Sequence, residues 1–134
     1  MGYVIKMPCI GFPELIECGE NGDMSEAVFE SLKQEASPRI QFFEDAPIYL
    51  ESGEYILLAD EDGKNKRLPI NELATAFYNN PYDYICGDVF ISRRDETELT
   101  YMTEEDLAIF KEMFSLMGPL KEKRLKILDV YKEV

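Results

Sequence analysis

Histidine and tryptophan are absent from the 134-residue sequence, and cysteine occurs only three times. Without histidine, the chain cannot build a Ser–His or Cys–His nucleophile from its own residues. Cys9, Cys18 and Cys86 include no C-x-x-C pair, which excludes a zinc ribbon and a thioredoxin-type motif. We therefore expect no catalytic residue, no metal site, no cofactor and no disulfide. Scattered thiols of this kind favour a reducing compartment.

Long hydrophobic runs are also missing. No stretch of about 18 uncharged apolar residues occurs, which excludes a transmembrane helix. Residues 1–12 lack the basic segment that precedes the apolar core of a secretory signal peptide. Together with the thiols, these features predict a cytoplasmic protein that does not enter a membrane.

Basic residues are scarce: 14 lysines and arginines stand against 27 aspartates and glutamates, a net charge of −13. The imbalance is concentrated in residues 1–62, with 14 acids and 3 bases, whereas residues 118–134 hold 3 acids and 5 bases. A negative field of this size disfavours direct contact with nucleic acid or anionic membranes, whose phosphates attract Lys and Arg. It suits a basic protein partner, or simply a well-solvated surface.

What remains is sufficient for a folded domain. Hydrophobic residues make up 46% of the chain and aromatic residues 12%, and chains of about 100–150 residues most often form one domain. Segments of strand and helix character alternate without a repeat or a linker. We predict a single α+β domain over residues 1–134, with a mainly antiparallel sheet and about four helices. The final helix, residues 119–132, is interpreted as an appended packing element.

Strands are predicted where apolar residues alternate or run together between turn residues. They are residues 3–7, 14–17, 40–43, 48–50, 54–59 and 84–92, with residues 64–68 as a return arm and residues 93–98 as a charged turn. The near-continuous apolar character of residues 84–92 predicts a central strand covered on both faces, with Phe90 or its neighbours Val89 and Ile91 nearly fully buried.

Helices are predicted from capping residues and helical spacing. The first follows Asp23, with Glu26 completing a capping box, and ends at Pro38. The second starts at Pro69 and ends at Asn79, and the third spans residues 103–117 and packs on the sheet.

Six carboxylates in the acidic half recur about every three residues. They are Glu14, Glu17, Glu20, Asp23, Glu26 and Glu30. Two of them, Glu26 and Glu30, are four apart in a predicted helix and share one face. Ordered on one surface, such carboxylates can imitate DNA phosphates and bind a basic partner such as a nuclease. These six are the predicted partner-binding residues, and their common surface is a hypothesis.

Two other functions stay open. Arg93 and Arg94, or the carboxylates, could form the site of a small enzyme or small-ligand-binding domain, which a cleft with converging polar groups would favour. Alternatively, the helices of residues 103–132, with Met113 and Met117 on one stripe, could be the interface of a structural or regulatory homo-oligomer.

Several segments carry a resemblance to a known family. They are Ile56 to Lys64, Leu68 to Asn71, Gly87 to Ile91 and the acidic helix start from Leu99 to Leu107, with a weaker fit of Val4, Ile5 and Pro13 to Glu17. Together they resemble domain of unknown function 3846, a family of small proteins from bacteria, their phages and mobile elements. The resemblance implies a phage or mobile-element origin, hence the cytoplasm of a bacterial host, and implies no activity. We therefore expect a non-enzymatic acidic protein that binds a host or partner protein, in one form as a nucleic-acid-mimicking inhibitor.

Overall fold

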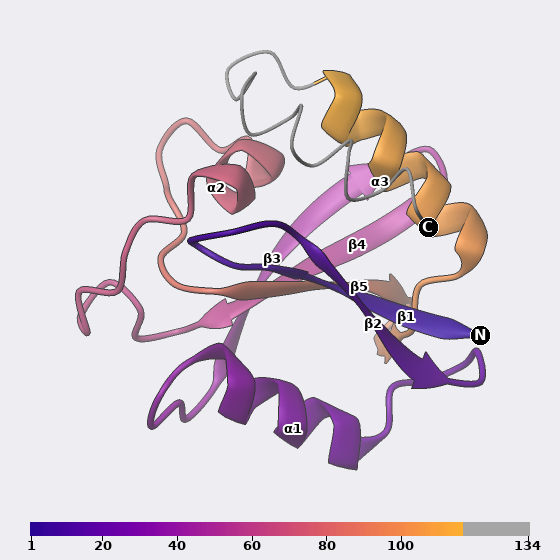
Figure 1. The fold of residues 1–134 in the computed structure, drawn as a ribbon, viewed down its shortest axis with the longest axis horizontal. Helices are drawn as coiled ribbons and strands as arrows, with labels where there is room; N and C mark the ends of the chain where they lie inside the picture. The colour runs from indigo at the N-terminus through magenta and orange to yellow at the C-terminus, as the bar shows by residue number, and fades with distance from the viewer. Residues whose placement is uncertain (117–134) are drawn as a thin grey trace.

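Six strands form one antiparallel sheet in the computed structural model, which describes residues 1–116. The strands are β1 (Gly2–Met7), β2 (Glu14–Gly19), β3 (Phe43–Leu50), β4 (Gly53–Asp60), β5 (Val89–Asp95) and β6 (Glu98–Thr100). Their order is β2-β1-β5-β4-β3, and β6 pairs with β5 (Figure 1). The predicted antiparallel sheet of a small α+β domain is confirmed.

Three helices cover the two faces of this sheet. α1 (Glu26–Ala36) lies on one face, and α2 (Glu72–Tyr78) and α3 (Glu104–Leu116) lie on the other (Figure 1). The described part of the chain therefore holds three helices rather than four, since the predicted helix 119–132 lies outside it. Of the predicted oligomer interface, only α3 falls within the described residues. None of these three helices is long and apolar enough to span a membrane.

Each face of the sheet has its own hydrophobic core. Phe90 belongs to the core beneath α1, and Ile91 to the core beneath α2 and α3, because successive side chains of a strand point to opposite faces. Val89, Phe90 and Ile91 have no exposed surface. On the second face, the ring of Phe110 in α3 contacts the ring of Tyr55 edge to face, with centroids 4.9 Å apart. The predicted burial of this central strand and the packing of the third helix are confirmed.

The start of α1 differs from the prediction. Its N-cap is Ser25, whose hydroxyl accepts a hydrogen bond from a first-turn amide at 3.2 Å. The predicted cap, Asp23, instead forms an antiparallel bridge with Thr100. Pairing with the end of β6 keeps the backbone extended through Asp23, so the helix cannot begin earlier, and the capping box with Glu26 is wrong.

The start of α2 also differs. The helix begins at Glu72 after the cap Asn71, not at Pro69. Residues 69–70 are held by residues 86–87 instead, because the amide of Gly87 donates to the carbonyl of Pro69 at 2.7 Å. The predicted end is confirmed, since Asn79 adopts the left-handed conformation that ends many helices (φ 52°).

Four predicted strand segments differ from the structure. The pieces 40–43 and 48–50 are replaced by one strand, β3, which pairs with β4 along its whole length. The return arm 64–68 is wrong because β3 and β5 already pair with both sides of β4, so that segment winds through turns. The predicted strand 84–92 begins only at Val89, after Gly87 takes a positive φ of 86°.

The predicted charged turn, residues 93–98, is wrong in its first half. Its first three residues continue β5 and pair with β6, and Arg93 and Arg94 also pair with β4. The turn proper contains Glu96, with a φ of 57°, and Thr97. Charged residues remain in this strand because each arginine has a partner: Arg93 pairs with Asp106 at 2.7 Å, and Arg94 with a carboxylate of β4 at 2.6 Å.

Candidate functional site

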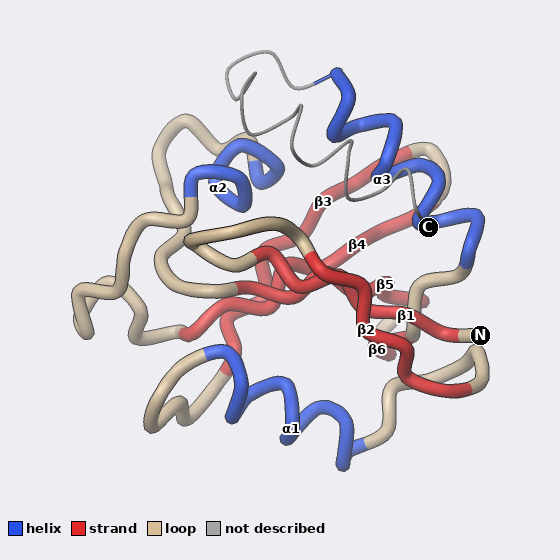
Figure 2. Tube along the Cα trace, viewed as in Figure 1, coloured by secondary structure: helices blue, strands red, loops and turns tan. Residues whose placement is uncertain are grey.

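Three connections meet where β1 and β4 end and β5 begins. This region, called the loop end here, consists of residues 8–13, 61–71 and 79–88 and lies to the left in Figure 2. Residues 8–13 are tied to it by Cys9, whose amide donates to the carboxylate of Asp88 at 2.8 Å. Two of the segments that carry the family resemblance, residues 68–71 and 87–91, meet here.

A single buried side chain, Asn71, joins the parts of the loop end. Its amide nitrogen donates to the carbonyls of Met7 at 2.8 Å and Gly87 at 2.9 Å, and its oxygen accepts from the amide of Ala74 at 3.0 Å. Asn71 has no exposed surface. Because one side chain holds the end of β1, the start of α2 and the approach to β5, its role is structural.

The glycine at position 87 allows two of these connections to approach closely. Its φ of +86° is unfavourable for any residue with a Cβ, and a Cβ there would lie 2.8 Å from the Leu68 side chain. The residues shared with the family pattern at this end therefore explain how the loops are fixed, and they need no ligand to account for them.

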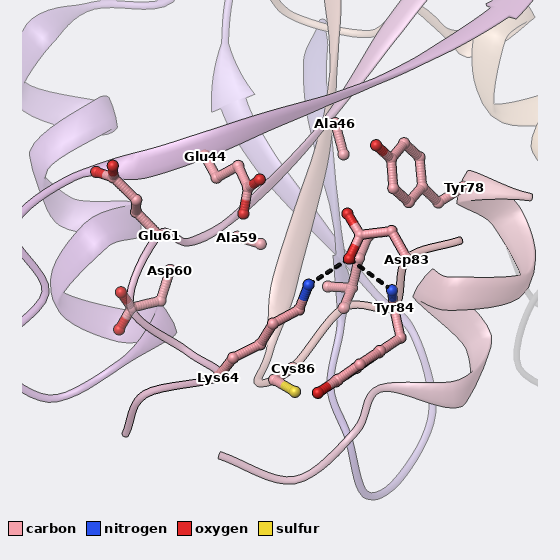
Figure 3. A pocket seen from close by; sticks show the side chains of 11 residues that line it. Glu44, Ala46, Ala59, Asp60, Glu61, Lys64, Tyr78, Asp83, Tyr84 and Cys86 are labelled. Carbon is pink, nitrogen blue, oxygen red and sulfur yellow. Dashed lines mark hydrogen bonds and ion pairs between the residues drawn. The ribbon is translucent and has the colours of Figure 1, made fainter. Parts of the chain in front are cut away.

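Beside these loops lies a small hollow with a cavity volume of about 20 Å³. Eleven residues line it: Glu44, Ala46, Ala59, Asp60, Glu61, Lys64, Tyr78, Asp83, Tyr84, Ile85 and Cys86. Figure 3 shows the ammonium group of Lys64 pointing toward the carboxylate of Asp83. The Lys64 ammonium also lies 4.5 Å from the ring centroid of Tyr84. Hydrogen bonding between the pair raises the pKa of Lys64 and lowers that of Asp83, so both stay charged near neutral pH.

The hollow offers paired charges rather than reactive groups. Burial raises the pKa of Asp60, but the hydrogen bonds from Lys66 at 2.6 Å and the amide of Asp62 at 2.8 Å outweigh it and hold the pKa below its usual value. Burial raises the pKa of the Cys86 thiol, which keeps it protonated and unreactive. The cations at the hollow are therefore engaged by carboxylates, and the geometry does not favour anion binding there.

The two arginines considered for a ligand site do not converge. As neighbours in β5 they point to opposite faces of the sheet. Arg93 donates to Asp106 at 2.7 Å and to the carbonyl of Ser52 at 2.8 Å. Arg94 donates to Glu54 at 2.6 Å and lies 3.7 Å from the carboxylate of Asp45. Both are engaged within the fold, and the structure brings neither into a cleft shared with the other.

All six predicted partner-binding acids are exposed. Glu14 and Glu17 belong to β2, and since they are three residues apart they point to opposite faces of the sheet. Glu20 and Asp23 follow in the β2–α1 connection, and Glu26 and Glu30 lie on α1. The structure thus places Glu26 and Glu30 one turn apart on α1 and Glu14 and Glu17 on opposite faces of the sheet, and partner binding by the six stays a prediction.

The structure adds acids that sequence reasoning did not group with these six. The β2–α1 connection runs beside β6, with the amide of Met24 bonded to Leu99 at 2.8 Å and the amide of Tyr101 bonded to Gly22 at 2.9 Å. Six exposed carboxylates belong to these two neighbouring segments, and they define the acidic end: Glu20, Asp23 and Glu26 on one, and Asp95, Glu96 and Glu98 on the other. The sequence held one signal for this surface, since residues 14–26 and 95–105 contain no lysine or arginine.

Within residues 1–116, no three or more Cys, Asp or Glu side chains are arranged to hold a metal ion. The three cysteines are free thiols.

Comparisons with known proteins identify a family and nothing more specific. A family model described as Domain of unknown function (DUF3846) matches residues 19–115, more than half of the chain. No curated protein and no solved structure matches. The matched range contains the whole acidic end and two of the three connections of the loop end, and it leaves out β1 and nearly all of β2.

Proposed function

The chain belongs to the DUF3846 family, whose description assigns no activity, and we propose that it is a non-enzymatic interaction protein that binds a basic partner protein through its acidic end. The observation that carries the proposal is the separation of charge in the fold. Six exposed carboxylates lie on two segments that are distant in sequence and joined by backbone hydrogen bonds, and residues 14–26 and 95–105 contain no lysine or arginine. Lysines of the loop end, by contrast, are paired with carboxylates.

Neighbouring carboxylates at a surface create a negative potential that steers a basic partner toward it. Exposed charges are screened over about 8–10 Å at physiological ionic strength. Binding through the acidic end should therefore weaken strongly as salt rises, and the loss should appear mainly in the association rate.

One form of the proposal follows the family resemblance. In that form the chain comes from a phage or mobile element, and the partner is a host protein whose groove binds nucleic-acid phosphates. Carboxylates of the acidic end would then occupy the groove in place of phosphates. Double-stranded DNA should compete with the chain for such a partner, whereas a partner without a nucleic-acid groove should be insensitive to DNA.

The test is a charge reversal with a matched control. The triple variant Glu20→Lys, Asp23→Lys and Glu98→Lys reverses the acidic end, and Glu44→Lys, Glu61→Lys and Glu112→Lys change the net charge equally elsewhere. Each protein is used to capture partners from bacterial lysate at low and high salt. We expect the wild type and the control to recover the same partners at low salt and the acidic-end variant to lose them. Equal recovery by all three proteins at both salts would contradict the proposal.

A further inference from the structure

The two outer strands of the sheet, β2 and β3, have edges of different kinds. On β1, Tyr3 exchanges both backbone hydrogen bonds with Met102, at 2.9 and 2.8 Å, so its N–H and C=O point away from β2. Along an antiparallel strand, the backbone N–H and C=O groups of successive residues point alternately toward one neighbouring strand and toward the other. Glu17, opposite Tyr3, and Leu15, opposite Ile5, are therefore not hydrogen-bonded to β1. Their N–H and C=O groups point outward along the free side of β2.

The same alternation of backbone direction can be followed from β1 through β5 and β4 to β3, where it shows which backbone groups point outward from the sheet. The groups that point outward there belong to Asp45, Pro47 and Tyr49. Proline has no N–H, and proline in an edge strand prevents further strand pairing. The middle of the β3 edge is thus blocked, whereas β2 contains no proline. Among residues 1–116, no strand pairs with the outer side of β2.

Side chains of β2 suit an added strand. Leu15 is half-buried against the core beneath α3, and Ile16 is half-buried against the core beneath α1. A strand added beside them would extend both apolar faces. On either side of this pair, Glu14 and Glu17 are exposed, with their carboxylates on opposite faces.

We propose that the edge of β2 binds an extended segment of a basic protein by strand addition. The segment would carry lysine or arginine residues three apart, with two apolar residues between them. Its backbone would pair with Leu15 and Glu17, and its cations would lie across from Glu14 and Glu17. This inference rests on the proposed function, because it takes the partner to be basic. It adds a second binding surface of this chain, the edge of β2, whose last residue, Gly19, precedes Glu20 of the acidic end, and it adds the sequence pattern of the segment bound there.

A second copy of the chain suits this edge less well. Pairing β2 with β2 would bring two more carboxylates, those of the copy's own Glu14 and Glu17, to the same short edge, and like charges across strands are destabilising. The chain as a whole also carries a charge of −13. The charges that attract a basic segment therefore oppose self-association through β2.

The test uses two fluorescent peptides of identical composition with the cores Lys-Val-Val-Lys and Lys-Val-Lys-Val. Only the first places its cations three apart, on opposite faces of an extended strand. We expect the first to bind the full chain about tenfold more tightly than the second. Equal affinities would show that charge alone drives binding and would overturn the inference.

A proline variant separates backbone pairing from charge. Leu15→Pro removes one outward N–H and leaves every charge and the hydrogen bonds to β1 in place, so it should weaken binding of the first peptide about tenfold. Leu15→Val is the matched control and should bind like the wild type. If Leu15→Pro binds like the wild type, the inference is overturned, while the proposed function still stands or falls on the acidic-end variant.

Hydrogen exchange gives a readout that does not depend on a folded proline variant. In the free chain, the amides of Leu15 and Glu17 should exchange fast, and those of Glu14 and Ile16, which face β1, should be protected. The first peptide should protect Leu15 and Glu17 selectively. Binding without this alternating protection would overturn strand addition.

A charge-swapped pair tests the electrostatic part of the pairing. The variant Glu14→Lys with Glu17→Lys should bind a Glu-Val-Val-Glu peptide, and failure to do so would contradict the proposed pairing.

Discussion

The loop end and the acidic end use polar side chains in opposite ways. At the loop end, Asn71 is fully buried and all of its hydrogen bonds go to the protein. At the acidic end, Glu20, Asp23 and Glu98 are exposed. Polar residues at the first end therefore stabilise the fold, and those at the second are available to a partner. The residues that carry the family resemblance include some of the loop end. Their presence is explained by the fold and does not indicate a ligand shared by the family.

The largest expected effect is loss of the buried amide. Asn71→Ala leaves the carbonyls of Met7 and Gly87 buried without their donor and removes the cap of α2. Unsatisfied buried groups and a lost cap together should lower the free energy of unfolding by about 3 kcal/mol. Urea denaturation measures this. The exposed Asn65→Ala is the control and should stay within about 0.5 kcal/mol of the wild type. A loss below about 1 kcal/mol for Asn71→Ala would remove the structural role assigned to the loop end.

One carboxylate outside the loop end, that of Asp106, is buried like the side chain of Asn71, and we therefore expect it to stabilise the fold. Asp106 has a 3% exposed side chain and accepts hydrogen bonds from Arg93 at 2.7 Å, Tyr55 at 2.6 Å and the Thr103 amide at 2.8 Å. Burial alone would raise its pKa, but these hydrogen bonds outweigh burial and hold the pKa below the ordinary 3.8. Asp106→Asn should therefore cost about 2–3 kcal/mol at pH 7.

The difference in stability between the wild type and Asp106→Asn should depend on pH, and the direction of that dependence follows from the lowered pKa. A carboxyl with a lowered folded-state pKa stabilises the fold fully above its unfolded pKa and loses that contribution as the pH falls through the folded value. The stability gap between wild type and Asp106→Asn should therefore be constant down to about pH 5 and narrow below the ordinary carboxyl value, about pH 4. Urea midpoints of both proteins from pH 7 to pH 3 measure it. An exposed control, Asp95→Asn, should stay within about 0.5 kcal/mol of the wild type at pH 7.

The smallest effect compares one glycine from each end. Gly87 has a φ of +86° and a Cβ there would lie 2.8 Å from Leu68, whereas Gly19 beside the acidic end has a φ of +97° and nothing within 4 Å. Gly19→Ala should cost about 1 kcal/mol from backbone strain alone, and Gly87→Ala about 2 kcal/mol because the contact adds to the strain. Thermal or urea unfolding of both variants measures the difference. Equal losses of unfolding free energy in the two variants would mean that the close contact between residue 87 and Leu68 adds nothing to the destabilisation.

Local signals in the sequence predicted much of this fold. The apolar run before Ser92 predicted a central strand, and the Asn79–Pro81 segment predicted where α2 ends. Both predictions succeeded because the signals come from neighbouring residues. The prediction failed where a distant partner decides the conformation. Asp23 looks like a helix cap but is held extended by Thr100. Arg93 looks like part of a turn but lies in a strand because it pairs with Asp106.

The candidate site was foreseen in part for the same reason. Exposure of the acids in β2, α1 and their connection followed from local patterns. Their connection to the β5–β6 hairpin, which carries Asp95, Glu96 and Glu98, depends on a contact between segments far apart in the sequence, since Asp23 lies opposite Thr100. The spacing of the acids within residues 14–30 therefore could not predict that contact.

The strand order also has a consequence for how the chain folds during synthesis. β1 is made first, yet its central partner is β5, with Ile5 opposite Ile91. Until that late strand has been made, β1 and β4 each keep a side that can pair wrongly with other chains, and such non-local pairing folds slowly. The early segment carries most of the net charge, with 14 acids and 3 bases in residues 1–62. Mutual repulsion between incomplete chains would protect them from aggregation during this wait, a benefit of the acidic half that does not depend on any partner.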